Sequence, residues 1–370
     1  MKILNNKITA NELADILRIS NKEVLRELYA QAYDVKLRHR GPNVYFRGLI
    51  EISNICKKNC LYCGIRAGNE KVIRYELLDS QIVNEAHFAL NAGYGSVVLQ
   101  GGERCDKAFT NRITKLIKEI RLLRRNNFNK EANSNALGIT LSLGEQSKEV
   151  YKEWYDAGAH RYLLRIEASN RELYQKIHPC DNTISSGAND ARIKSIKDLK
   201  SIGYLTGTGV MIGLPFQTYI DLANDILFFK EMDIDMVGMG PYIPHSDTPL
   251  GKMYMSGIMV PGEVANLNNE ERLELSLKMV AVLRCIMPTI NIAATTALQV
   301  LAPDGRERAL LAGANIIMPN VTDLSVKGNY NLYEGKPGVK DDAQTTKYEL
   351  EKNLERLGIP IGWDMLGDVR

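Results

Sequence analysis

Residues 44–64 read VYFRGLIEISNICKKNCLYCG, a short apolar run that passes directly into a loop with three cysteines. The β-branched and aromatic residues of 44–52 predict a buried β-strand. The loop then places Cys56, Cys60 and Cys63 close together in sequence. Three thiolates can hold three corners of a cubane iron–sulfur cluster, which leaves the fourth iron open to a small molecule. An open iron predicts chemistry rather than electron storage alone.

A short β-rich run followed by a longer amphipathic helix is repeated along most of the chain. We expect eight strands, at residues 44–53, 95–99, 138–143, 162–166, 207–212, 236–239, 290–293 and 315–318. Strict alternation of strand and helix favours a parallel sheet, and eight units favour closure into a TIM-type (β/α)8 barrel of the α/β class. An open doubly wound sheet is the alternative that this pattern leaves.

The chain divides into a helical N-terminal segment, the barrel and a C-terminal extension packed on the barrel, at residues 1–42, 43–330 and 331–370. Helix-start signals at residues 9–12 and 20–23 support the first of these parts, each with a hydroxyl at the cap and a glutamate three residues later. We expect one last helix at about 344–357. Polar stretches at 124–135 and 251–269 are interpreted as lengthened loops.

The charge balance gives no sign of a nucleic-acid or membrane partner. The chain has 47 basic and 44 acidic residues and a formal net charge of +3, which is too even to attract either surface. No signal peptide and no run of membrane-spanning length is seen, so we expect a cytoplasmic location. The other cysteines, Cys105, Cys180 and Cys285, are scattered and do not form a disulfide framework. A reducing compartment suits all of them.

The cysteine loop follows the first predicted strand, so it lies at the C-terminal mouth of the expected barrel. Active sites of this architecture are built there. A structural zinc site is the alternative, but zinc normally takes four ligands, and no fourth cysteine or histidine stands nearby in sequence. His245 also lacks neighbouring ligands and is interpreted as a structural loop residue.

The pattern Cys-x3-Cys-x-aromatic-Cys resembles the signature of the radical S-adenosylmethionine (SAM) enzymes. The resemblance implies that Cys56, Cys60 and Cys63 are catalytic ligands of a 4Fe-4S cluster and that the open iron binds SAM. One electron from the cluster would then cleave SAM to a 5′-deoxyadenosyl radical. Residues at successive strand ends match the family's order, and by resemblance the SAM contacts are Tyr62, Gly102, Glu103, Ser142, Glu167, Arg192 and Met211. For Arg192 and Glu167, a simple strand-end ion pair is the alternative.

The match extends to a narrower group, the maturases of FeFe-hydrogenase. Segments similar to that group are residues 47–54, 140–145, 161–165, 236–245, 294–297 and 313–320. The resemblance implies action in assembly of the hydrogenase active-site cluster, on a small cysteine- and iron-containing or thiazolidine-like substrate. The implied substrate contacts are Arg47, Gln100, Thr140, Arg165, Thr295, Thr296, Met318 and Tyr330. Implied partners are an electron donor such as ferredoxin or flavodoxin and other hydrogenase maturases.

Other functions fit parts of the same pattern. A methylornithine-synthase-like amino-acid mutase would use the same radical on another substrate. Biotin-synthase-like sulfur chemistry needs a second cluster, and the sequence has no cysteine after Cys285 to help bind one, so we expect a single cluster. A hypothesis of a different class is an iron–sulfur carrier or scaffold that does not turn SAM over.

Overall fold

Eight parallel strands form the centre of the computed structural model, which describes residues 8–125, 137–179 and 188–369. The sheet order is β10-β1-β2-β3-β4-β5-β7-β9, and a two-stranded sheet β6-β8 extends it. The strands are β1 (Tyr45–Ser53), β2 (Ser96–Gly101), β3 (Gly138–Ser142), β4 (Arg161–Leu163), β5 (Leu205–Thr208), β6 (Met211–Ile212), β7 (Met236–Val237), β8 (Gly240–Pro241), β9 (Asn291–Ile292) and β10 (Ile316–Ile317). Each of the eight predicted strands is found.

The two outer strands of this sheet, β9 and β10, are joined to each other. Ala293 and Ile316 form a parallel bridge, and the amide of Asn315 donates to the carbonyl of Ile292 over 2.9 Å. The amide of Ala294 donates in turn to the carbonyl of Ile316, also over 2.9 Å. The barrel prediction is confirmed, and the open doubly wound sheet is not what forms.

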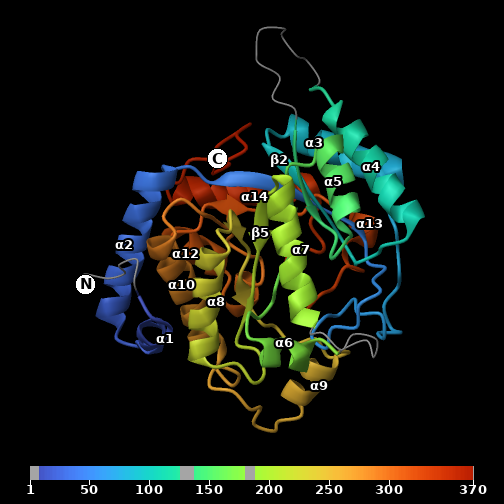
Figure 1. Cartoon of the computed structure of the whole chain (residues 1–370). Coiled ribbons are helices and arrows are strands. Elements are labelled where there is room, and N and C mark those ends of the chain that lie inside the picture. The colour runs from blue at the N-terminus through green and yellow to red at the C-terminus, as the bar shows by residue number, and fades with distance from the viewer. Residues whose placement is uncertain (1–7, 126–136, 180–187, 370) are drawn as a thin grey trace.

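Helices surround the sheet in the order that the sequence predicts (Figure 1). They are α1 (Ala10–Arg18), α2 (Lys22–Arg40), α3 (Asp79–Asn91), α4 (Lys107–Arg121), α5 (Lys148–Ala157), α6 (Arg171–Ile177), α7 (Ala188–Ile202), α8 (Tyr219–Glu231), α9 (Pro249–Met255), α10 (Asn269–Ile286), α11 (Leu298–Leu301), α12 (Gly305–Leu311), α13 (Leu324–Lys327) and α14 (Ala343–Arg356). The expected last helix is α14. The expected loop at 251–269 overlaps the end of α9, and most of the 124–135 stretch lies outside the described residues.

The N-terminal helices pack on the outside of the barrel. Thr9 and Glu12 form a complete capping box at the start of α1. The second cap differs from the expectation, because Asn21 and not Ser20 accepts the first free amides of α2. Helix α1 lies against α8, and α2 lies against α10, so this segment buries its apolar faces on the barrel helices.

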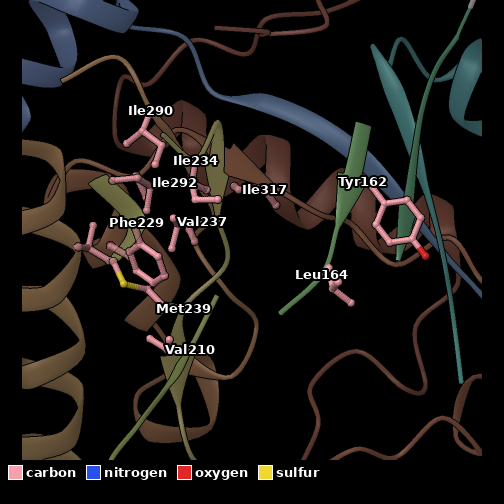
Figure 2. Packing of buried hydrophobic residues seen from close by; sticks show 14 of the residues in the cluster. Tyr162, Leu164, Val210, Phe229, Ile234, Val237, Met239, Ile290, Ile292 and Ile317 are labelled. Atoms are coloured by element: carbon pink, nitrogen blue, oxygen red, sulfur yellow. The ribbon is translucent and has the colours of Figure 1, made fainter. Parts of the chain in front are cut away.

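The apolar core lies between the strands and the covering helices. Figure 2 shows Phe229 of α8 beside Val237 and Met239. Period-two alternation along a strand sends one set of side chains to this layer and the other into the barrel. On β1, a Cβ on Gly48 would meet Ala89 of α3 at 3.1 Å, so Gly48 faces the helices. The odd-numbered residues of β1 therefore face the barrel interior.

The C-terminal segment covers the end of the barrel where the strands begin. Ile361 bridges Val44 at the entrance to β1, and the segment lies at the top of Figure 1. Its Asp368 carboxylate lies 2.9 Å from Arg161 Nε, 3.2 Å from His160 Nε2 and 3.8 Å from Arg47 Nη2. Both arginine side chains are almost fully buried. The chain thus provides an anion for two interior cations.

We predict that Asp368→Asn destabilises the fold by about 3 kcal/mol, because it leaves two buried guanidinium groups without their carboxylate. Burial alone would raise the pKa of Asp368, but His160 and the arginines lower it below its ordinary value. The stabilisation is therefore present above the unfolded pKa of about 3.9 and is lost as pH falls through the lower folded value. Urea unfolding measures the change, and the exposed Asp15→Asn is the control. Equal midpoints for the two variants would contradict the prediction.

Among the described residues, no helix is both long and apolar enough to cross a bilayer.

Candidate functional site

The cysteine loop lies at the end of the barrel opposite Asp368. It follows β1, and Leu61 in the loop bonds to the ends of two helices: its amide donates to the Ile177 carbonyl over 2.9 Å, and the Leu250 amide donates to its carbonyl over 3.1 Å. These contacts place the loop beside α6 and α9, at the bottom of Figure 1.

Arg74 fixes the shape of this loop from within. Its Nη1 donates to the carbonyls of Asn54 and Ile65 at 2.7 and 2.8 Å. Its Nη2 donates to the carbonyls of Arg66 and Asn69 at 2.7 and 3.2 Å. The sequence pattern gave no signal for this role, because an arginine far along a loop carries no spacing rule.

The three cysteines are free thiols that lie close enough to influence one another. Burial raises the pKa of Cys60 to about 11 and also raises the pKa values of Cys56 and Cys63. The amide of Glu103 donates to Cys56 Sγ over 3.3 Å. A backbone amide that points at a cysteine sulfur stabilises the thiolate that forms when a metal replaces the thiol proton.

This donor set fits a cubane cluster better than a single ion. In residues 8–125, 137–179 and 188–369, no three His, Cys, Asp or Glu side chains converge as a mononuclear metal requires. A cubane differs because each thiolate binds its own iron. The three-thiol loop therefore agrees with the cluster and gives the zinc alternative no support.

Four charged side chains meet beside the cysteine loop. Arg192 Nε lies 2.5 Å from Glu145 Oε1, and Arg192 Nη2 lies 3.9 Å from Glu103 Oε2. Lys58 Nζ lies 2.9 Å from Glu145 Oε2 and 3.4 Å from Glu103 Oε1. Lys57, whose side chain is 49% exposed, adds a third cation at the edge of this group, with Nζ 3.5 Å from Glu103 Oε1. Each of the two carboxylates therefore has cationic partners, which offset the cost of burying it.

The electrostatics of this charge cluster keep Glu145 ionised. Burial would raise the pKa of Glu145, but Arg192 and Lys58 together lower it to about 2. Glu103 and Arg192 were predicted from the sequence, whereas Glu145 and Lys58 were not assigned a role. Glu145 stands three residues after the end of β3, and this position on the loop that follows a strand is the signal that could have identified it.

Tyr62 is held by a residue that the sequence did not single out. Its hydroxyl donates to His178 Nε2 over 2.9 Å, while His178 Nδ1 donates to the carbonyl of Tyr174 over 3.1 Å. Burial lowers the pKa of His178 to about 3, so the ring is neutral and can accept this bond. Tyr62 and Met211, both predicted SAM contacts, pack against one small apolar cluster of Ala168, Leu173, Ile177, Leu214, Tyr242 and Leu250.

Glu167 adopts an unusual backbone conformation at the end of β4. Its φ is 63°, a left-handed value that costs a non-glycine residue about 1–3 kcal/mol and tends to occur at functional sites. Both of its carboxylate oxygens bind Arg165, at 2.7 and 2.9 Å. Arg165 also donates to the carbonyls of Val210 and Gly238. The side chain predicted for substrate is thus paired with the side chain predicted for SAM.

Glycine is required where Arg165 reaches these carbonyls. A Cβ on Gly209 would stand 1.9 Å from the Gly238 carbonyl oxygen. The close approach interrupts two strands, so that β5 resumes as β6 and β7 resumes as β8.

Several other predicted contacts gather in one layer of the barrel. Gln100 pairs in register with Ser142 on one side and with Glu51 on the other. Six of the predicted contacts are partly exposed even though they belong to the barrel. They are Gln100, Ser142, Met211, Thr295, Thr296 and Met318. Tyr330 is buried, and its hydroxyl interacts with Gln100. Gly102 is buried against the cysteine loop, where a Cβ would lie 2.3 Å from the Ile55 carbonyl oxygen.

Arg47 and Thr140 lie lower in the barrel than the other predicted contacts. Six residues of strand, about 20 Å at 3.3 Å per residue, separate Arg47 from the end of β1. Arg47 contacts Asp368 and the sulfur of Met236, and Thr140 accepts a bond from Arg161 over 3.4 Å. The structure does not bring these two to the cysteine loop, and their substrate role stays a prediction.

A segment from the C-terminal part of the chain crosses the cysteine loop. We call residues 329–336 the strap. The amide of Gly64 donates to the Leu332 carbonyl over 3.0 Å, and Asn54 Nδ2 donates to the Asn329 carbonyl over 2.8 Å. His245 packs against Gly64 and accepts the Asp247 amide over 3.1 Å, as expected of a structural histidine.

We predict that Gly64→Ala disrupts the cysteine loop. The added Cβ would stand 2.0 Å from the Asn331 carbonyl oxygen and 2.5 Å from the His245 ring, so backbone must move next to Cys63. A reconstituted variant should therefore hold less than about half the iron of the parent, since a displaced supporting group costs 10- to 100-fold in metal affinity. Gly328→Ala, which meets nothing within 4 Å, is the control. Full iron content in Gly64→Ala would refute the clash.

Comparison with known proteins agrees with this site. The family model described as the radical SAM superfamily matches residues 50–229. The [FeFe] hydrogenase maturase subunit HydE of Thermotoga maritima is 38% identical, covering 100% of this chain and 96% of its own length. The 3-methylornithine synthase of Methanosarcina barkeri is 27% identical, covering 88% of this chain and 84% of its own.

Solved structures show the same fold. The crystal structure of methylornithine synthase has a TM-score of 0.75 at 22% identity, covering 96% of this chain and 94% of that one. The maturase HydG has a TM-score of 0.73 at 19% identity, covering 95% and 72%. Because the likeness to HydE reaches 38% identity and covers all of this sequence and 96% of that relative, it identifies the family as well as the fold. The chain belongs to the radical SAM superfamily and, within it, to the family of HydE.

Proposed function

We propose that this radical SAM enzyme acts in maturation of FeFe-hydrogenase. The relative named as a hydrogenase maturase supports the proposal, since it is 38% identical over the full chain. The observation that carries the chemistry is the three-thiol loop beside the charge cluster around Glu103, Glu145 and Arg192. When bound, the 4Fe-4S cluster and SAM supply a 5′-deoxyadenosyl radical.

We assign each group of side chains in the site a separate role in binding the cluster or SAM. Cys56, Cys60 and Cys63 would hold the cluster. Arg192, with its planar pair of donors, suits the carboxylate of SAM, and Glu103 and Glu145 offer acceptors for its amino group. Tyr62, Gly102, Ser142, Glu167 and Met211 complete the proposed SAM contacts.

The proposed substrate is a small cysteine- and iron-containing or thiazolidine-like molecule. Partly exposed hydroxyl, amide and thioether groups inside the barrel support it, because they combine hydrogen bonding with soft, polarizable contact. The proposal includes an electron donor such as ferredoxin or flavodoxin and cooperation with other maturases. Free thiols at the five described cysteines suit a reducing compartment, and we propose the cytoplasm.

Anaerobic reconstitution with iron and sulfide, followed by dithionite reduction and addition of SAM, tests the reaction. We expect 5′-deoxyadenosine to be released. A fully reconstituted, reduced sample that releases none would leave the iron–sulfur carrier hypothesis and overturn the enzymatic one.

A second function, an amino-acid mutase, is supported by the sequence likeness to 3-methylornithine synthase of Methanosarcina barkeri, which is 27% identical over 88% of this chain. Incubation of the loaded enzyme with a panel of free amino acids separates the two functions. Formation of methylornithine would support the mutase, whereas rescue of hydrogenase activity in a maturation assay would support the maturase.

A further inference from the structure

A buried ion pair ties the strap to the first strand of the barrel. Lys336 Nζ lies 2.5 Å from Glu51 Oε1, and the two side chains are 9% and 1% exposed. Lys336 Nζ also donates to the Tyr330 carbonyl over 2.9 Å and lies 5.2 Å from the centre of the Tyr330 ring. The Lys336 ammonium therefore interacts with both the strap and β1.

Glu51 is itself held in place by three further groups. Its Oε2 accepts a bond from Asn320 Nδ2 at 3.0 Å, and its amide donates to Thr322 Oγ1 at 2.8 Å. Tyr75 donates to its carbonyl at 2.7 Å. These bonds hold the Glu51 backbone and one carboxylate oxygen, so the ion pair joins the strap to a fixed point on β1. The strap has a second attachment at Glu334, which accepts bonds from the amide and hydroxyl of Ser246 at 3.1 and 2.6 Å.

The strap connects this pair to both the cluster loop and the barrel interior. Leu332 accepts the amide of Gly64, the residue after Cys63. Burial, and then the charge of Glu51, raise the pKa values of Tyr330 and Tyr333, so both phenols lie near the same carboxylate. One segment therefore carries a backbone support of the cluster loop and two aromatic side chains at the barrel mouth.

We propose that Lys336 is a positioning residue: its ion pair with Glu51 latches the strap across the barrel mouth and thereby fixes the cluster loop against the SAM-binding side chains. The inference rests on the proposed SAM chemistry. It assigns Lys336 and Glu51 no contact with the reacting atoms. Without the latch, the strap no longer holds the Gly64 amide, and the loop shifts relative to Arg192 and Glu103.

Hydrogen–deuterium exchange of the reconstituted holoenzyme tests the latch directly. In Lys336→Met we expect amides in peptides 61–66 and 329–336 to exchange about tenfold faster, with α3 and α4 unchanged, because local opening exposes only the released segment. Lys336→Arg should restore protection. Lys340→Met, at an exposed lysine of the same extension, should exchange like the parent. Parent-like protection in Lys336→Met would overturn the proposal.

Kinetics of 5′-deoxyadenosine release separate positioning from simple loss of folded enzyme. We expect the KM for SAM to rise roughly tenfold in Lys336→Met and in Glu51→Gln, with kcat per cluster changing less, because binding geometry is lost. The double variant should be no worse than either single one, since both remove the same ion pair. Unchanged KM with lowered cluster content would show only a structural role and refute the latch. Failure of the parent itself to release 5′-deoxyadenosine would instead refute the proposed function.

Discussion

A Cys63→Ala variant is expected to lose the iron–sulfur cluster and the release of 5′-deoxyadenosine together. Three thiols leave one of the four irons open, whereas two thiols would leave two irons without a protein ligand, so two cannot hold the cubane in the same state. Loss should exceed about 100-fold, because even a change in a group that merely supports a ligand costs 10- to 100-fold. Among the described residues, the two other cysteines lie outside the cysteine loop: Cys105 donates to the Glu145 carbonyl over 3.3 Å, and Cys285 belongs to α10.

Iron and sulfide content per chain, the electron paramagnetic resonance signal of the reduced protein and chromatography of 5′-deoxyadenosine measure this result. Cys105→Ala is the matched control, since it removes an exposed thiol on the neighbouring loop. It should keep both cluster and cleavage. A Cys63→Ala protein with parent iron content and parent cleavage would disprove the ligand assignment.

The fold could be predicted because its signal is local and repeated. Each strand is a short apolar run and each helix has its own amphipathic period, so eight separate stretches point to the same architecture. The helix N-caps were predicted less accurately than the strands and helices themselves. Asn21 replaces Ser20 as the cap of α2, because neighbouring residues of similar capping strength compete at one position.

The site could be predicted only where chemistry and spacing coincide. Cys56, Cys60 and Cys63 share one loop, so their spacing carries the information. The charge cluster could not be predicted in this way, because Lys58 and Glu145 come from two loops and Arg192 comes from α7, and these segments meet only in the finished barrel. Lys336 is similar, since its contact with Glu51 is long-range and leaves no period in the sequence. Arg74 bonds to nearby carbonyls of its own loop, and no spacing rule marks such an arginine.

Arg47 shows a second limit of what the sequence can predict about the site. Its place on β1 correctly indicated an interior side chain, and it is fully buried. The nearby anion, however, comes from Asp368 at the other end of the chain. Sequence reasoning demands a partner for a buried guanidinium, but it cannot tell a substrate from a carboxylate that the protein supplies itself.

Arg192→Met should raise the KM for SAM by about 100-fold, since loss of one member of a buried, hydrogen-bonded charge pair costs 2–5 kcal/mol. Two effects contribute. The proposed carboxylate partner of SAM is removed, and Glu145 is left buried with Lys58 alone. Isothermal titration with SAM under anaerobic conditions, alongside KM and kcat for 5′-deoxyadenosine release, measures the loss. Arg171→Met, at an arginine that is 58% exposed, is the matched control.

The pH dependence of stability distinguishes these two effects. In the parent, Arg192 and Lys58 hold the pKa of Glu145 at about 2, so its charge persists at every pH near neutrality. Without Arg192 that pKa rises, the folded state binds a proton more readily than the unfolded state, and the variant regains stability as pH falls. Adding Glu145→Gln removes the unpaired charge and should restore stability without restoring SAM affinity. Because Glu145 is itself a proposed acceptor for SAM, the affinity of the double variant is compared with that of the Glu145→Gln single variant. Recovery of SAM affinity in the double variant would mean that Arg192 only neutralises Glu145, and it would remove the guanidinium from the SAM site.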